Sequence, residues 1–93
     1  MRKYIGTYTV VNKKVVESDD LKIITSMLEN DLVEICFNGA TWNSLYYYPK
    51  DQTYWLHSYE GEAGFDNGIR VLTEIDVATA MRIKAEWQAK KNI

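Results

Sequence analysis

Several residue types are scarce in this chain of 93 residues, and each scarcity excludes a class of protein. A single cysteine excludes a disulfide framework, and one cysteine with one histidine excludes a zinc site of Cys and His ligands within the chain. Only one proline and five glycines are present. Apolar residues make up 46% of the sequence, which is typical of a folded protein, so we expect a single domain over residues 1–93.

Long apolar runs are missing as well. The basic residues Arg2 and Lys3 are followed by a stretch that polar residues interrupt from Thr7 onward. A secretory leader needs about 7–15 consecutive apolar residues, and a membrane helix needs about 20. The sequence therefore predicts a cytoplasmic protein with no membrane contact, and the lone Cys36 agrees with a reducing compartment.

Positive charge is not clustered anywhere in the chain. There are 11 basic and 13 acidic residues, which gives a net charge of −2. Residues 17–34 contain six carboxylates and a single basic residue, Lys22. Because a nucleic-acid backbone requires a basic face, we expect no nucleic acid as a partner. The acidic segment is instead expected to attract a basic protein.

The pattern of apolar residues predicts an α+β fold with the order ββαββββα. Ser18, followed by Asp19 and Asp20, marks the start of a helix that ends near residue 30. Asp76 caps a second helix, whose predicted face is traced by Val77, Ala80, Met81, Lys84 and Trp87. Strands are expected over residues 4–10, 14–16, 32–38, 42–48, 54–59 and 69–75, with a two-residue turn at Asn12-Lys13. Short connections favour a single antiparallel β-sheet packed by two helices that cover one face.

Strict alternation assigns side chains to the two faces of each predicted strand. In residues 32–38 it places Val33, Ile35 and Phe37 on one face and Glu34 and Cys36 on the other. In the hairpin 42–59 it places large rings on both faces. One of these faces is expected in the core. For the other, three interpretations remain open: cross-strand packing, a protein-binding surface, or a platform for a small molecule or a base.

Residues that could carry chemistry do not form a recognisable motif. His57 is the lone histidine, and Ser58 next to it points to the opposite face of the strand, so no nucleophile is paired with it. Cys36 lies between two apolar residues and is expected to be a packed thiol. The glycines at 61, 64 and 68 match neither a Walker loop nor a dinucleotide fingerprint. We therefore expect no enzymatic activity, no metal and no cofactor.

The aromatic hairpin carries a family resemblance. Its string Trp42-Asn43-Ser44-Leu45-Tyr46, followed by Pro49-Lys50-Asp51, Tyr54-Trp55 and Tyr59, resembles the bacterial immunity proteins of family 27. Earlier segments are similar too: Gly6-Thr7-Tyr8, Lys14-Val15-Val16 with Asp19-Asp20, and Leu32-Val33-Glu34-Ile35. The resemblance spans about residues 6–80. The chain departs from the family pattern where Ala40-Thr41 precede Trp42 in place of a glycine, and where Thr53 and Leu56 replace an arginine and a glutamate.

The resemblance implies a non-enzymatic function. Proteins of this family are implied to bind and neutralise a cognate toxin domain, as in polymorphic toxin systems and contact-dependent growth inhibition. We expect that toxin to be a nuclease, blocked at its active site or at its substrate approach. The expected contacts are three aromatic anchors and four carboxylates: Trp42, Tyr48, Phe65, Asp51, Glu60, Glu62 and Asp66.

A different class of function also remains open. The hairpin 42–59 could form the wall of a pocket for a small molecule or a substrate, with His57 and Glu60 as its polar groups. That alternative predicts a concave site of about 300 Å³ or more lined by the hairpin's rings. A plain assembly module is a third possibility. The sequence does not identify the toxin, nor whether the chain forms homo-oligomers.

Overall fold

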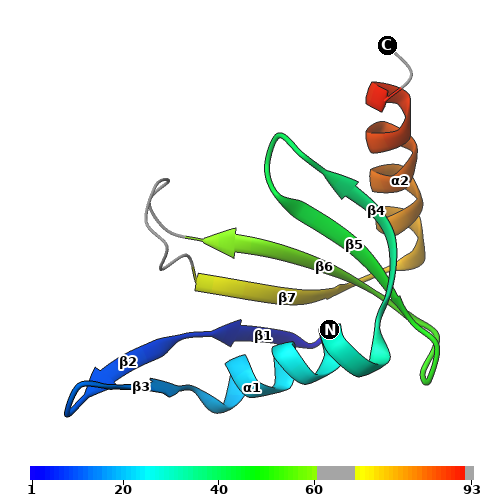
Figure 1. Cartoon of the computed structure of the whole chain (residues 1–93). Coiled ribbons are helices and arrows are strands. Elements are labelled where there is room, and N and C mark those ends of the chain that lie inside the picture. Colours follow the sequence, from blue (N-terminus) through cyan, green and yellow to red (C-terminus); the bar gives the residue numbers. More distant parts are fainter. Residues whose placement is uncertain (61–68, 92–93) are drawn as a thin grey trace.

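The computed structural model describes residues 1–60 and 69–91. Within these ranges the order of elements is β1 (Lys3–Gly6), β2 (Tyr8–Val11), β3 (Lys14–Glu17), α1 (Asp19–Ser26), the π-helical turn η1 (Met27–Asp31), β4 (Val33–Asn38), β5 (Asn43–Tyr48), β6 (Thr53–Glu60), β7 (Ile69–Ile75) and α2 (Val77–Lys91) (Figure 1). This order confirms the predicted α+β class. The first predicted strand is divided into β1 and β2. No helix in the described parts of the chain is long and apolar enough to cross a membrane.

The strands form two antiparallel sheets, whereas a single sheet was expected. Five strands pair in the order β1-β7-β6-β5-β4, and β2 pairs with β3 alone. The division occurs at Thr7. This residue does not pair with β7 but hydrogen bonds to Ser18, at the start of α1. Its N–H donates to Ser18 Oγ (3.0 Å), and its C=O accepts from the Ser18 N–H (2.8 Å). These two bonds redirect the chain, and β2–β3 extends from the body as an arm (Figure 1).

The arm closes with the predicted two-residue turn. Asn12 and Lys13 have φ angles of 51° and 65°, the left-handed conformation that such hairpin turns require at both positions. Every residue of β2 and β3 is exposed, including four valines: Val10, Val11, Val15 and Val16. The arm therefore adds no buried side chain to the core.

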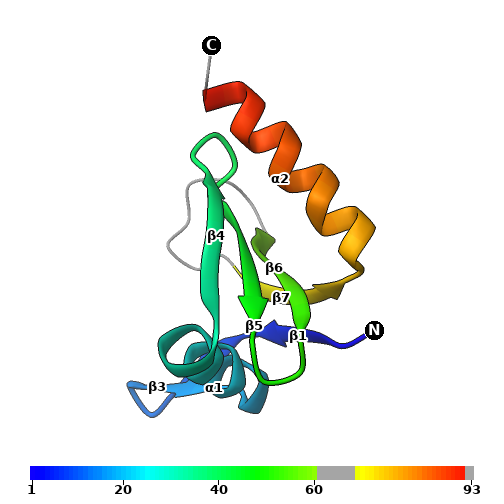
Figure 2. The ribbon, with the colours of Figure 1, turned by 90° about the vertical axis from the view of Figure 1, so that its right-hand side faces the viewer.

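The two helices lie on opposite faces of the five-stranded sheet. Ile24 and Met27, from α1 and η1, pack on Trp55 and Leu72, and this face is called the α1 face below. Ala80 of α2 packs on the other face, with Leu45 and Cys36. Figures 1 and 2 show α1 below the strands and α2 along the other side. The expectation that both helices cover one face is wrong. Three layers instead of two explain why the aromatic hairpin carries rings on both of its faces.

Helix α1 starts where the sequence predicts. Ser18 Oγ accepts the Leu21 N–H (3.1 Å), and Asp19 and Asp20 lie in the first turn, at the positive end of the helix dipole. At the other end, Leu32 donates its N–H to the Met27 C=O (2.8 Å), a five-residue span that closes the π turn and leads into β4.

Helix α2 begins at the predicted cap, and its packed stripe matches the predicted face only in part. Asp76 Oδ1 accepts the Thr79 N–H (2.7 Å). Ala80 is fully buried, and Ile83 and Trp87 follow it on the packed stripe at spacings of three and four. Val77 and Met81, which were expected to face the sheet, are 58% and 38% exposed.

Candidate partner-binding surface

The turn between β4 and β5 presents two aromatic rings at the margin of the sheet. Trp42 is 69% exposed, and its ring meets that of Phe37 edge to face, with centroids 6.1 Å apart. The Asn38 C=O accepts the Trp42 N–H (2.8 Å), and its side-chain oxygen accepts the Ala40 N–H (3.0 Å). These bonds hold Trp42 at φ 60°, a conformation that bulky residues rarely adopt. The turn therefore fixes the backbone of Trp42, and its indole is exposed beside the Phe37 ring.

A β-bulge in β4 brings Phe37 to this position. The register pairs Glu34 with Tyr46 and Phe37 with Ser44, and it shifts between Glu34 and Cys36. Tyr46 and Ser44 share the α1 face, so Glu34 and Phe37 share it too. The expectation that Phe37 lies on the face of Val33 is therefore wrong, because the extra residue Ile35 interrupts the alternation. Sequence reasoning missed Phe37 as a surface residue, since a bulge leaves no periodic signal.

A row of rings continues along the α1 face from this margin. The His57 ring lies 6.4 Å from that of Tyr46 and 5.0 Å from that of Tyr59, and the Arg70 guanidinium lies 5.9 Å from the centre of the Tyr59 ring. His57 is only 5% exposed, and no hydrogen-bond partner for its Nε2 is found in the described residues. Burial, and secondarily the charge of Arg70, lowers the pKa of His57 to about 4.

The structure places a serine opposite His57 but does not make them a catalytic pair. Ser44 is the cross-strand partner of His57 and is 6% exposed. Its side chain hydrogen bonds to Tyr46, where it opposes the rise that burial causes in the pKa of the phenol. Nε2 accepts no hydrogen bond from Ser44, and the pKa of His57 lies well below neutrality, so His57 is poorly suited to act as a general base.

At the opposite end of the sheet, Arg2 contacts two carboxylates and one aromatic ring. Its Nη2 lies 2.6 Å from Asp51 Oδ2 and its Nε lies 2.8 Å from Glu74 Oε1, while its Cζ stacks 4.9 Å from the centre of the Trp55 ring. Asp51 also accepts the Thr53 hydroxyl. The Thr53 hydrogen bond, followed by that from Arg2, holds the pKa of Asp51 below its usual value. The Asp51 carboxylate is therefore already engaged within the chain.

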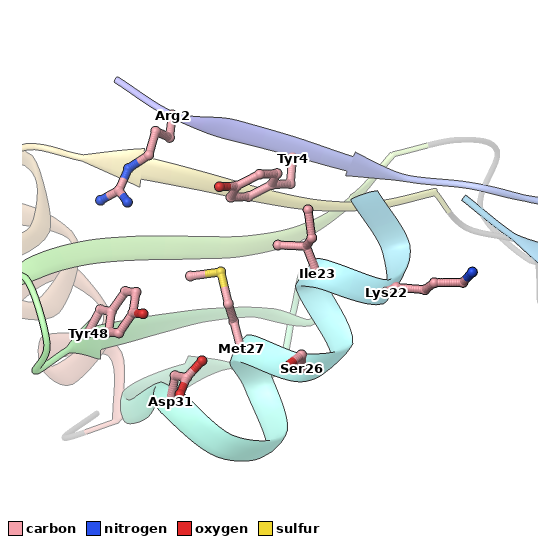
Figure 3. Close-up of a pocket in the computed structure, with 8 residues that line it drawn as sticks. All are labelled: Arg2, Tyr4, Lys22, Ile23, Ser26, Met27, Asp31 and Tyr48. Carbon is pink, nitrogen blue, oxygen red and sulfur yellow. The ribbon is translucent and has the colours of Figure 1, made fainter. Parts of the chain in front are cut away.

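A groove of about 420 Å³ lies at the same end, between α1 and the sheet (Figure 3). Its lining mixes cationic, acidic and apolar side chains: Arg2, Tyr4, Lys22, Ile23, Ser26, Met27, Asp31 and Tyr48. Of the aromatic hairpin only Tyr48 contributes, and neither His57 nor Glu60 lines it. The pocket expected from the hairpin's rings with His57 and Glu60 is therefore not this groove. In the described parts of the chain, no three His, Cys, Asp or Glu side chains converge to hold a metal ion.

The predicted contact residues divide between the two ends of the sheet. Trp42 and Glu60 lie at the β4–β5 turn and the end of β6, whereas Tyr48 and Asp51 flank the β5–β6 turn. Strand β6 separates the pairs by about 20–25 Å at its rise per residue. The remaining predicted contacts, Glu62, Phe65 and Asp66, lie outside the described residues. The structure therefore does not unite the predicted set into one surface.

One family model matches most of the chain. The family model described as immunity protein 27 matches residues 10–76, more than two thirds of the chain. The chain belongs to the immunity protein 27 family. The matched range covers β3 to β7 and so includes the aromatic hairpin, the β4 bulge and the Phe37–Trp42 pair. No curated protein and no solved structure matches the chain.

Proposed function

We propose that this chain is a cytoplasmic immunity protein that binds a cognate bacterial toxin domain and neutralises it without catalysis. Membership in the immunity protein 27 family over residues 10–76 is the observation that carries the proposal. The toxin domain belongs to a polymorphic or contact-dependent growth-inhibition system. Binding occludes its active site or the approach of its substrate.

The charge distribution supports a nuclease as the toxin. Between Lys22 and Lys50 the sequence contains no lysine or arginine but three carboxylates, Glu29, Asp31 and Glu34. Lys50 Nζ lies 3.6 Å from Asp31 Oδ1 and pairs with this carboxylate. The other two carboxylates, Glu29 and Glu34, are exposed. Nucleases bind phosphate in cationic clefts. An acidic surface on the immunity protein speeds its association with such a cleft and competes there with the nucleic-acid substrate.

The contact region that we favour lies at the Trp42 end of the sheet. Trp42 supplies an exposed indole, and Glu60 ends β6 with an exposed carboxylate. The Tyr48 end is a weaker candidate, because Asp51 is paired with Arg2 and bonded to Thr53. Glu62, Phe65 and Asp66 remain contacts expected from the sequence.

Coexpression tests the function directly. The probe is the C-terminal domain of the protein encoded by the adjacent reading frame, expressed alone and together with this chain. We expect the domain to be toxic alone, growth to recover when this chain is present, and a one-to-one complex to copurify. A domain that stays toxic and does not copurify with this chain would contradict the proposal.

One pair of charge reversals distinguishes the two ends of the sheet. Glu60→Lys and Asp51→Lys make the same change at opposite ends of β6. We expect Glu60→Lys to weaken the complex at least about fivefold and Asp51→Lys to leave its affinity within about twofold of the parent. The reverse ranking would move the contact region to the Tyr48 end. Isothermal titration with a catalytically inactive toxin domain provides both affinities.

A further inference from the structure

The five-stranded sheet has two edges, and only one of them is closed. At β1, the Ile5 N–H donates to Asp20 Oδ2 (3.1 Å) and the Thr7 N–H donates to Ser18 Oγ (3.0 Å). These side chains come from the start of α1 and occupy the backbone groups that β1 turns away from β7. An incoming strand would have to displace both of them, so the β1 edge is protected.

The β4 edge carries no such closure in the described part of the chain. Residues of an antiparallel strand direct their backbone groups alternately to its two sides. Glu74 donates its N–H to the C=O of Arg2, the residue before β1 (2.9 Å). This bond shows which residues of β7 bond toward β1, and the register extends the alternation through β6 to β5. Ser44 and Tyr46 therefore bond to β6. Their partners in β4, Phe37 and Glu34, turn their N–H and C=O groups outward. Figure 2 shows β4 at the margin of the sheet.

The side chains beside this open edge are aromatic and acidic. Phe37 is 37% exposed and is extended by the 69% exposed ring of Trp42. Glu34 is exposed on the same face of β4. Glu29 precedes the strand in η1, and the nearest basic residues in sequence are Lys22 and Lys50, of which Lys50 is paired with Asp31. The edge thus offers backbone hydrogen bonds, an apolar anchor and negative charge together.

We infer that the cognate toxin domain docks by adding an extended, basic segment to the β4 edge as a sixth strand, an inference that rests on the proposed function. The segment's backbone bonds with Glu34 and Phe37. A lysine or arginine of the segment faces Glu34, and an apolar side chain packs on the Phe37–Trp42 pair. Strand addition of this kind draws affinity from main-chain bonds and specificity from the flanking side chains.

A second copy of this chain fits the same edge less well. Two β4 strands paired across a two-fold axis would place Glu34 of both copies along one seam, with no lysine or arginine from residues 23–49 to oppose them. A basic segment has the complementary charge. The exposed Glu34 carboxylate on the α1 face of β4 therefore favours a basic partner protein over self-association.

Amide hydrogen exchange of the intact protein tests the inference. The probe is a catalytically inactive form of the toxin domain, added to isotope-labelled immunity protein and followed by NMR. We expect the amides of Glu34 and Phe37 to exchange quickly in the free protein and at least about tenfold more slowly in the complex. The amide of Lys3, which points outward from β1, is the internal control and should not change.

Two substitutions at one position separate the backbone bond from the side chain. Phe37→Ala removes the ring and keeps the backbone N–H, whereas Phe37→Pro removes both. The N–H that proline removes forms no hydrogen bond to β5, because it points away from the sheet. We expect the proline variant to bind at least about fivefold more weakly than the alanine variant. Lys3→Ala and Lys3→Pro repeat the pair on the β1 edge and should bind alike.

Three results would overturn the inference. A complex that forms while the Glu34 and Phe37 amides stay unprotected would place the interface elsewhere and leave the proposed function standing. Protection of these amides in the free protein, together with a dimer in sedimentation, would assign the edge to a second copy. The absence of any complex would remove the proposed function and this inference together. The exchange experiment uses the unmodified chain, so a proline variant that fails to fold does not decide the matter.

Discussion

Trp42 lies in the left-handed backbone region while its ring is mostly exposed, and His57 is buried with an Nε2 that has no partner in the described residues. Neither state stabilises the fold: the first costs backbone strain and the second costs desolvation. Such residues are common where a surface serves binding as well as folding. His57 lies on the α1 face, and Trp42 lies beside it in the β4–β5 turn. Substitutions of Trp42 test binding, and substitutions of His57 test stability.

Replacing Trp42 by glycine should separate folding from binding. Glycine adopts φ 60° without strain, so Trp42→Gly offsets the loss of the ring contact with Phe37. The free energy of unfolding should stay within about 1 kcal/mol of the parent. Affinity for the toxin domain should fall at least about tenfold. Gln52→Gly is the matched control, since Gln52 has φ 58° at the opposite end of the sheet. A Gln52→Gly variant that loses affinity equally would contradict the assignment of the contact to Trp42.

His57 should make the protein sensitive to mild acid. Its pKa is about 4 in the folded state against 6.5 ordinarily, so between pH 6.5 and 4 the unfolded chain binds a proton that the folded chain does not. The contribution of His57 to stability is complete above pH 6.5 and is lost as the pH falls toward 4. The size of the loss is about 2–4 kcal/mol.

Urea unfolding across this pH range measures the effect. His57→Phe keeps a ring between Tyr46 and Tyr59 and removes the titration, so its unfolding free energy should vary less between pH 6.5 and 4 than that of the parent. Tyr59→Phe alters the same row of rings without removing the imidazole and should retain the parent's acid dependence. Parallel pH curves for the parent and His57→Phe would show that His57 has the same pKa in the folded protein as in the unfolded chain.

The position of α1 depends on one small residue, Gly6. Gly6 in β1 is buried under the helix, and a Cβ placed there would lie 2.8 Å from Leu21 Cδ1, 3.0 Å from the Leu21 Cα and 3.1 Å from Ile24 Cδ1. One of these contacts is to backbone, so the helix would have to move. The close approach also lets Ser18 and Asp20 reach the β1 edge.

Gly6→Ala should therefore destabilise the protein by about 1–3 kcal/mol through overpacking. Gly39→Ala is the control, because a Cβ there would meet only Phe37 Cε1, at 3.8 Å. Thermal unfolding should show a clear decrease for the first variant and almost none for the second. Equal midpoints for the two would mean that α1 shifts without cost.

For the whole molecule, charge distribution is the property that should govern association. The net charge is only −2, but all charged side chains between Lys22 and Lys50 are carboxylates. This stretch includes the open β4 edge. Long-range attraction between this region and a basic toxin raises the association rate and is screened over about 10 Å at 0.1 M salt.

Raising the ionic strength from about 0.05 to 0.5 M should slow association with the toxin domain about tenfold or more, with a smaller change in the dissociation rate. Stopped-flow fluorescence can follow the reaction through the exposed indole of Trp42. Glu34→Lys should lower the rate at low salt and flatten its salt dependence. An association rate that does not respond to salt would contradict a basic partner.

Local patterns in the sequence determined most elements and the two helix starts. Ser18 and Asp76 cap helices because their side-chain oxygens accept N–H groups that the first helical turn leaves unpaired. Asp19 and Asp20 add negative charge at the positive end of the α1 dipole. Asn12-Lys13 forms its turn because both residues adopt left-handed φ angles. The string from Trp42 to Tyr59 carried the family resemblance, which the match over residues 10–76 confirms.

The tertiary structure alone decided which surfaces remain open. Periodicity reports how a strand alternates, but it does not say which face a helix will cover, so the placement of α1 and α2 on opposite faces was not predicted. The β4 bulge moved Phe37 across the strand, because one extra residue reverses every later side chain. The difference between a β1 edge closed by Ser18 and Asp20 and an open β4 edge depends on contacts between segments distant in sequence. Such contacts form only once the chain has packed.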